Sequence, residues 1–425
     1  MQKPRIAILS FPGNNGDTEN LRTFWRNGFD AFVFRWNDSH EKLKDTDGYF
    51  IGAGFSYEDR GRAGMVAARD PLFDFLHEEA DKGKVIVGHC NGAQVLVESG
   101  LVPVGKGLRM SLARNAIHES ENEWKSPGFL NEWIWITPAC KRDRCCASDW
   151  DGAMHIPIAH GEGRFVTKDP ELIAELEKND QVAFCYCDSE GKVSEDPSVT
   201  LNGSTKAIAG ICNPAGNVVA MMPHAERAIA GDLYFRSIKR WIEQIPNHQA
   251  PITKQTCLPA GRFQNPKSQS SNISKREVKP LEIFIDTIIV NNEERTVEQA
   301  ARRISPSLKL KQFRYLAPEG RSAEEILRTI ALFNPNKEKA YVRRGVEWTK
   351  WDPDTKNFID TDRPIADMAI LRRDEPDTTA TGIGGGETGV CYSLSDVSDS
   401  DLNNSKLQEI FGNPHASILE KMSDG

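Results

Sequence analysis

Short apolar runs alternate with amphipathic segments over residues 1–100 of the chain. Four of these runs, each followed by a turn-forming segment, predict buried strands at 5–10, 31–34, 48–51 and 85–89. Helical patterns fill the intervals, one beginning at Asp17 and another at Asp70-Pro71. Because strands that alternate with helices at this spacing form parallel units, the pattern predicts an α/β domain built on a mostly parallel sheet.

The pattern becomes richer in strand signals after residue 100. Further apolar runs predict strands at 133–136, 157–165 and 182–186. A hairpin is expected over 207–222, because the turn Asn213-Pro214-Ala215-Gly216 separates two apolar runs. An amphipathic helix follows at about 233–242, so the first domain is expected to continue to residue 247.

The periodicity stops after residue 247. A polar stretch rich in proline and serine predicts a linker at 248–280. Renewed patterns predict a smaller α+β domain over 281–373, whereas 374–425 is polar and partly glycine-rich and is expected to be a flexible tail. A length of 425 residues also favours two domains over one core.

Strand and helix patterns alternate within the second domain. Strands are expected at 281–290, 312–315, 341–350 and 364–371, and helices at 296–304 and 322–333. The second of these helices begins with a capping box of Ser322 and Glu325, which supplies partners for its first free N–H groups.

Composition narrows the class of protein. The net charge of −8 gives no reason to expect a nucleic acid or an anionic membrane as partner. No apolar run approaches the about 20 residues of a membrane span, and the N-terminal residues lack the pattern of a signal peptide. We therefore expect a cytoplasmic protein with reduced cysteines. Cys140, Cys145 and Cys146 lie close together, but without a Cys-x-x-Cys pair no metal site is expected.

Cys90 is the candidate nucleophile. It follows the strand at 85–89 and precedes a helical pattern, with Gly88 and Gly92 on either side. A nucleophile on a sharp strand-to-helix turn needs small neighbours, because the backbone there is crowded. The N-terminus of the following helix also favours a thiolate. The alternative is a structural cysteine buried in the sheet.

His224 is the candidate base for Cys90. It ends a predicted strand, and Glu226 stands two residues later. A carboxylate at this spacing can fix the tautomer of the imidazole and support its positive charge. The alternative is a histidine that only makes a structural hydrogen bond.

Taken together, Gly88-x-Cys90-x-Gly92-x-Gln94 and His224-x-Glu226 resemble the class I, triad-type glutamine amidotransferases. The resemblance becomes narrower with further motifs at 11–17, 54–64, 157–164, 202–204, 209–213 and 221–227. These are similar to the glutaminase subunit (PurQ type) of phosphoribosylformylglycinamidine synthase, a family of purine biosynthesis. The motifs occur in the expected order across about 1–245.

This resemblance implies a flavodoxin-like class I amidotransferase fold and glutamine hydrolysis. Cys90 would form a thioester with the side chain of glutamine, His224 would transfer the protons and Glu226 would orient His224. The backbone N–H groups of Asn91 and of the loop at Gly54 would form the oxyanion hole. The resemblance places the following residues near the substrate glutamine: Gln94, Glu162, Gly163 and Arg164.

The family also implies partners. The ammonia would pass to a separate large synthase subunit (PurL type), assisted by a small accessory subunit (PurS type). That large subunit would use ATP and Mg²⁺ to convert formylglycinamide ribonucleotide to formylglycinamidine ribonucleotide, and this chain would need no cofactor of its own. Two alternatives stay open: a divergent glutaminase that feeds a different ATP-dependent amination, and a non-catalytic scaffold of the synthase complex.

Three features depart from the family pattern. Ala53 replaces a usual glycine before Gly54, which would restrict the backbone of the oxyanion loop. His89 replaces a small or apolar residue, and we interpret it as filling space rather than tuning the thiolate. Residues 281–425 lie outside the resemblance and are interpreted as a docking domain for the synthase or for another ammonia acceptor.

Overall fold

The computed structural model of the chain describes residues 2–105, 107–120, 123–244 and 273–422. The chain forms two units, Met1–Phe263 and Gln264–Gly425. Most of the predicted linker at 248–280 lies outside the described residues, but its end contributes β14 (Ser274–Lys275) to the second unit. None of the helices in the described ranges is long and apolar enough to cross a membrane.

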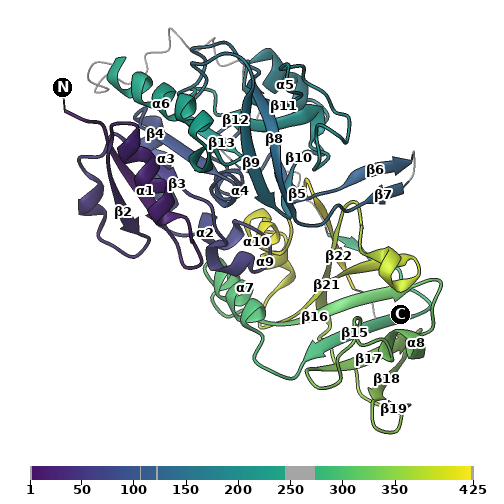
Figure 1. Ribbon diagram of the computed structural model, residues 1–425. Helices are drawn as coiled ribbons and strands as arrows, with labels where there is room; N and C mark the ends of the chain where they lie inside the picture. Colours follow the sequence, from purple (N-terminus) through teal and green to yellow (C-terminus); the bar gives the residue numbers. More distant parts are fainter. Residues whose placement is uncertain (1, 106, 121–122, 245–272, 423–425) are drawn as a thin grey trace. The chain divides into compact units, whose positions relative to one another are not determined.

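A nine-stranded sheet forms the centre of the first unit, in the order β2-β1-β3-β4-β13-β12-β11-β8-β9 (Figure 1). Its parallel half consists of β2 (Asp30–Arg35), β1 (Arg5–Ser10), β3 (Gly48–Ile51), β4 (Val85–His89) and β13 (Val218–Met221). Its antiparallel half consists of β12 (Ile208–Cys212), β11 (Val182–Cys187), β8 (Leu130–Pro138) and β9 (Met154–His160). The expected α/β class and the β12–β13 hairpin are confirmed, and the direction of the strands changes at that hairpin.

Both faces of the sheet are covered, which explains why its parallel strands are continuous apolar runs. Ala7 and Leu9 of β1 lie in a core with α3, α4 and α5, whereas Ile6 and Ile8 lie in a second core with α1 and α6. The helices are α1 (Asp17–Arg26), α2 (Met65–Ala68), α3 (Leu72–Asp81), α4 (Asn91–Glu98), α5 (Leu172–Lys178) and α6 (Asp232–Gln244).

Short elements complete the first unit. Two small antiparallel pairs join β5 (Ser111–Arg114) to β10 (Glu162–Val166) and β6 (Ile117–Ser120) to β7 (Glu123–Lys125). The 3₁₀ turns are η1 (His40–Leu43), η2 (Ser56–Asp59), η3 (Thr205–Ala207), η4 (Ala225–Arg227) and η5 (Ile229–Gly231).

The second unit is also sheet-rich, with strand order β14-β22-β20-β21-β16-β15-β17-β18-β19. These strands are β15 (Glu282–Thr287), β16 (Lys309–Pro318), β17 (Glu338–Arg344), β18 (Glu347–Asp352), β19 (Asn357–Asp360), β20 (Met368–Asp374), β21 (Gly386–Ser395) and β22 (Ser417–Lys421). Its helices are α7 (Asn292–Arg302), α8 (Ala323–Leu327), η6 (Ala380–Ile383), α9 (Asp399–Leu402) and α10 (Ser405–Phe411). The α+β character expected from the sequence is confirmed.

The prediction of a flexible tail over 374–425 is wrong for residues 374–422, and 423–425 lie outside the described residues. β21 pairs with β16 along its whole length and lies between β16 and β20, while β22 pairs with β20. Gly384 and Gly385 have φ angles of 83° and 92° and form the turn into β21, which only glycine adopts easily. The run of Asp and Ser residues caps α9 through a box of Ser398 and Asp401. Turn and cap chemistry therefore accounts for a composition that resembles a disordered tail.

Two further predictions in the second unit are corrected. The expected strand at 341–350 is a hairpin of β17 and β18, with Gly345 at φ 61° in its turn. The helix expected at 322–333 has the predicted capping box of Ser322 and Glu325 but ends at Leu327.

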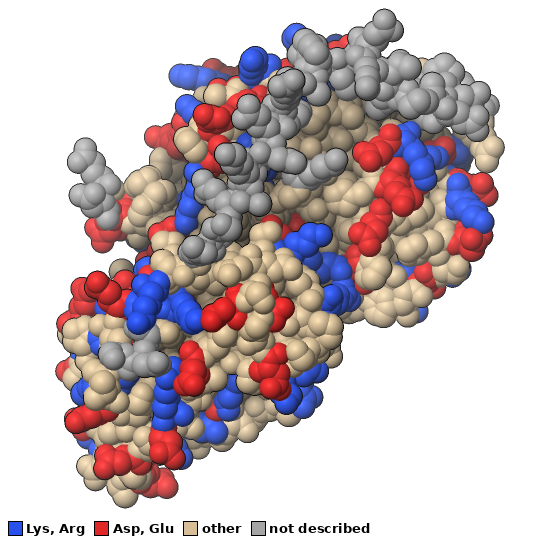
Figure 2. All heavy atoms as spheres, turned by 180° about the vertical axis from the view of Figure 1, so that it is seen from behind, with Lys and Arg blue, Asp and Glu red and all other residues tan. Residues whose placement is uncertain are grey.

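On the face of the molecule seen in Figure 2, basic and acidic side chains are interspersed.

Candidate active site

Cys90 lies on a strained turn between β4 and α4. Its backbone angles are φ 51° and ψ −109°, and its N–H donates to the Met221 carbonyl over 2.9 Å. A Cβ atom on Gly88 would lie 2.4 Å from the Gly92 carbonyl oxygen, and one on Gly92 would lie 2.0 Å from the carbonyl oxygen of Ile51. The prediction of a sharp turn that needs small neighbours is confirmed.

His224 and Glu226 come directly after β13, the strand next to β4. Nδ1 of His224 lies 2.6 Å from Oε1 of Glu226, and both side chains are buried. The Thr23 hydroxyl donates to the Glu226 carbonyl oxygen over 3.0 Å and so ties this segment to α1. Nε2 of His224 has no hydrogen-bond partner among the described residues. That nitrogen is therefore available to Cys90 and to a substrate.

Electrostatics favour a charged pair here. Burial opposes a charge on His224, but Glu226 and Cys90 outweigh burial and raise its pKa to about 10. Burial would likewise raise the pKa of Glu226, but His224 and His89 hold that pKa well below its usual range. The arrangement therefore favours the protonated imidazole of His224, which lies between the Glu226 carboxylate and Cys90.

The side chain of Asn91 fixes the start of α4. Its Oδ1 accepts from the Ser56 N–H over 3.0 Å, and its Nδ2 donates to Asp59 Oδ1 and to Gln94 Oε1. The adjoining loop passes through Gly54 at φ 150°, where a Cβ atom would lie 2.7 Å from Asn14 Cα. Among residues 52–54, the conformation that favours glycine therefore falls on Gly54.

The expectation that Ala53 restricts this loop is not supported. Ala53 is not among the residues with positive φ, so its Cβ atom meets no backbone strain. The substitution of the usual glycine is accommodated because Gly54 alone takes the glycine-specific conformation.

Of the four residues expected near the substrate, Gln94 and Glu162 are connected by hydrogen bonds to the turn that carries Cys90. Gln94 Nε2 donates to the Glu162 carbonyl oxygen over 2.5 Å, and Glu162 Oε2 accepts from the Ala63 N–H over 3.2 Å. Together with Asn91 they form a hydrogen-bonded chain that begins one residue after Cys90.

The other two residues lie farther along β10. The Gly163 N–H donates to Asn115 Oδ1 over 3.2 Å, and a Cβ atom on Gly163 would lie 2.2 Å from the His160 ring. Arg164 Nε donates to the Arg114 carbonyl oxygen, and its guanidinium lies 5.2 Å from the Trp124 ring centroid. These contacts hold β10 against β5.

Two groups near Cys90 have contacts that the sequence did not predict, the buried His89 and the half-buried Asp59. His89 Nδ1 lies 2.7 Å from Glu226 Oε2, so the interpretation of His89 as space-filling is wrong. Asp59 lies beside Glu162, and burial together with that carboxylate raises the pKa of Asp59 to about 7. The sequence marked His89 by its position next to Cys90 and by its departure from the family pattern, and it marked Asp59 only by its place in a matched motif.

The described part of the chain contains no group of three His, Cys, Asp or Glu side chains arranged to hold a metal ion. Cys145 and Cys146 are buried, and Cys140 is half-buried. Burial raises the pKa of the Cys146 thiol. These thiols therefore behave as protonated packing groups.

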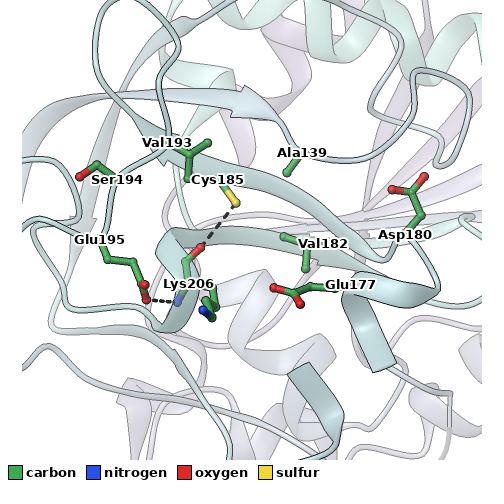
Figure 3. Close-up of a pocket in the computed structure, with 9 residues that line it drawn as sticks. All are labelled: Ala139, Glu177, Asp180, Val182, Cys185, Val193, Ser194, Glu195 and Lys206. Atoms are coloured by element: carbon green, nitrogen blue, oxygen red, sulfur yellow. Dashed lines mark hydrogen bonds between the residues drawn. The ribbon is translucent and has the colours of Figure 1, made fainter. Parts of the chain in front are cut away.

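A separate cavity of about 420 Å³ lies beside β11 and the end of α5 (Figure 3). Within it Cys185 Sγ donates to the Lys206 carbonyl oxygen over 3.7 Å, and the Lys206 N–H donates to Glu195. None of Cys90, His224 and Glu226 lines this cavity, so it is distinct from the site described above.

His160 makes the stability of the first unit sensitive to acid. Burial, with the nearby His224, lowers the pKa of His160 to about 3 from an ordinary value of 6.5. Between these values the unfolded chain binds the proton that the folded chain excludes, so stability falls as the pH falls. We expect His160 to contribute a slope of up to about 1.4 kcal/mol per pH unit.

Urea unfolding at several pH values between 4 and 7 measures this slope. The control is His160→Asn, which does not titrate, so it should lose stability less steeply toward low pH than the unaltered chain. Equal slopes for the two proteins would contradict a neutral, buried His160.

Comparison with known proteins places the first unit in a family. Residues 3–248 match the family described as the CobB/CobQ-like glutamine amidotransferase domain. The chain is similar to "Phosphoribosylformylglycinamidine synthase subunit PurQ" of Methanothrix thermoacetophila, with 41% identity over 56% of this chain and 98% of the relative. The protein of the same name from Thermomicrobium roseum is 39% identical over 53% of this chain and 87% of the relative.

One chain in a solved structure is also similar to part of this chain. "Structure of PurLQS from Thermotoga maritima" contains a chain that is 30% identical, covers 57% of this chain and 100% of its own length, and has a TM-score of 0.44. The family match ends at residue 248, so the second unit lies outside it.

Proposed function

Because the chain belongs to the CobB/CobQ-like glutamine amidotransferase family, and to its PurQ-type members, we propose that Cys90 hydrolyses glutamine through a thioester. The ammonia released serves the conversion of formylglycinamide ribonucleotide to formylglycinamidine ribonucleotide in purine biosynthesis. The main observation that supports this proposal is the buried pair of His224 and Glu226 next to Cys90, whose backbone is strained.

In the first half of the reaction, the Cys90 thiolate attacks the amide carbon of glutamine and forms a C–S bond. The electron pair of the C=O bond moves to the oxygen, where the N–H groups of Asn91 and Gly54 stabilise the charge. The imidazolium of His224 gives its Nε2 proton to the amide nitrogen. The C–N bond then breaks, ammonia leaves and a γ-glutamyl thioester remains.

In the second half, water attacks the thioester carbon while His224 accepts a proton through Nε2. The C–S bond breaks, glutamate leaves and the thiolate–imidazolium pair is restored. Glu226 keeps Nδ1 of His224 as the donor throughout, so that Nε2 always faces the reacting atoms.

The substrate side of the site is supported by the chain of hydrogen bonds from Asn91 through Gln94 to Glu162. We assign Gln94, Glu162, Gly163 and Arg164 to holding glutamine. The first two are hydrogen-bonded to each other next to the nucleophile turn, and the other two hold β10 against β5.

The relatives are named as subunits of a synthase, which supports a partnered enzyme. We assign the ATP- and Mg²⁺-dependent step to a PurL-type partner, with a PurS-type accessory subunit, and no cofactor to this chain. The second unit is not part of the family match, so we assign it to docking on the synthase. Because the second unit lies outside the family match, one alternative also stays open, in which the ammonia is passed to an acceptor other than formylglycinamide ribonucleotide.

An assay of the full chain with its PurL-type and PurS-type partners, ATP, Mg²⁺ and formylglycinamide ribonucleotide tests the proposal. Glutamine should be hydrolysed, and formylglycinamidine ribonucleotide should form in step with glutamate. Absence of glutamine hydrolysis with all partners present would contradict the enzyme proposal.

A pull-down with the full chain as bait, followed by mass spectrometry, identifies the acceptor. Recovery of the PurL-type synthase is the expected result. Recovery of a different ATP-using enzyme in its place would replace the purine step with the alternative.

A further inference from the structure

The carboxylate of Glu226 is held by two histidines, one on each oxygen. His224 Nδ1 lies 2.6 Å from Oε1, and His89 Nδ1 lies 2.7 Å from Oε2. His89 is the last residue of β4 and directly precedes Cys90. The end of β4 therefore positions two groups: Cys90 as the nucleophile, and His89 as a second hydrogen-bond donor for Glu226.

We propose that His89 is a positioning residue for catalysis, which donates from Nδ1 to Oε2 of Glu226 and thereby keeps Oε1 aimed at His224. This inference rests on the proposed glutaminase function. His89 touches neither glutamine nor the reacting atoms, and it acts only through Glu226.

The surroundings of His89 argue against a role in packing alone. Its ring is fully buried, with the rings of Phe50, Tyr234 and Phe235 at centroid distances of 4.9, 4.9 and 5.9 Å. Its Nε2 atom has no hydrogen-bond partner among the described residues. An apolar side chain would fill the same space without a buried, unsatisfied nitrogen, so the polar ring is explained by its bond to Glu226.

The other groups around Glu226 cannot replace this bond. The Arg227 guanidinium lies 4.0 Å from Oε1, is partly exposed and also pairs with Glu19. The buried Tyr234 hydroxyl makes no hydrogen bond to a described residue, and Thr23 bonds only the backbone oxygen of Glu226. In the part of the chain that the structure describes, His89 makes the one hydrogen bond to Oε2.

Loss of the His89 bond has two expected effects. The carboxylate gains freedom to rotate, so His224 is less often oriented toward Cys90 and kcat falls. The pKa of Glu226 also rises, because the hydrogen bond from His89 helps to lower it. Glu226 is then protonated at a higher pH, and the acid limb of the kcat profile moves to higher pH.

Three variants, measured in the full complex with its synthase partners, separate this role from packing. His89→Asn retains an N–H donor near the position of Nδ1, whereas His89→Gln places its amide farther out and His89→Leu has no donor. We expect about 10- to 100-fold lower kcat for His89→Leu and His89→Gln, with KM for glutamine little changed. His89→Asn should retain most of the kcat and the acid limb of the unaltered chain.

A folded His89→Leu with the kcat and pH profile of the unaltered chain would overturn the proposal. Equal losses in His89→Asn and His89→Gln, with no movement of the acid limb, would also overturn it and leave packing as the role. Failure of the proposed function is a different result, since the unaltered chain would then hydrolyse no glutamine in the complex.

A measurement on the unaltered chain does not depend on how the variants fold. In the ¹⁵N NMR spectrum at neutral pH, Nδ1 of His89 should carry a proton that is hydrogen-bonded to Glu226. An unprotonated Nδ1 would overturn the proposal, because no donor would then face Oε2.

Discussion

Replacing Cys90 with alanine should lower glutamine-dependent ammonia release in the synthase complex by about a thousandfold or more. The thiolate forms the C–S bond of the proposed thioester, and Cys90 interacts directly with the proposed base His224. Alanine is smaller than cysteine and leaves Gly88 and Gly92 unchanged, so the turn should retain its shape. The readout is glutamate formed per unit time at saturating glutamine.

Two controls make the Cys90→Ala result specific. The variant should bind its synthase partner as tightly as the unaltered chain, because Cys90 is buried in the first unit. The partner should also still amidate its substrate when free ammonia replaces glutamine. Substantial glutamine hydrolysis by the variant would contradict the role of Cys90, and loss of partner binding would mean that the change disturbs the fold.

Replacing Gly92 with alanine should both destabilise the first unit and lower its activity. The added Cβ atom would lie 2.0 Å from the Ile51 carbonyl oxygen and 2.7 Å from its carbon, which are backbone atoms of β3. A side-chain rotation cannot relieve this overlap, so α4 must move away from the sheet. We expect a loss of about 3 kcal/mol in the free energy of unfolding.

The activity of Gly92→Ala should fall by about a hundredfold, because a shift of α4 displaces Cys90 relative to His224. The matched control is Gly161→Ala, where the nearest atom to the new Cβ is a Phe129 side-chain carbon at 3.8 Å. Denaturant unfolding of the two variants gives the comparison. A Gly92→Ala chain as stable as Gly161→Ala would contradict the close packing of α4 on β3.

The strands of the parallel half of the sheet were predictable because both of their faces are buried. Their side chains alternate between two apolar cores, so β1, β3 and β4 are continuous apolar runs. In the second unit β21 begins as Gly386-Glu387-Thr388-Gly389 and only its later residues, such as Tyr392 and Leu394, are buried. The position of β21 in the sheet depends on its pairing with β16, about 80 residues earlier in the chain. The local sequence of β21 does not indicate that pairing.

The candidate catalytic residues were predictable for a different reason. Cys90 lies between two glycines, and His224 and Glu226 lie two residues apart. The spacing of these residues along the chain is therefore enough to suggest their catalytic roles. The bond from His89 to Glu226 joins residues 137 positions apart. It also depends on which carboxylate oxygen faces which strand, and only three-dimensional geometry shows that.

Detection of the covalent intermediate is the most direct test of the role of Cys90. The full complex is mixed with glutamine, quenched in acid during turnover and digested, and the peptide that contains Cys90 is analysed by mass spectrometry. We expect a γ-glutamyl group on Cys90 that disappears when glutamine is exhausted and is absent from Cys90→Ala. Steady glutamine hydrolysis with the γ-glutamyl group on another residue would contradict this role.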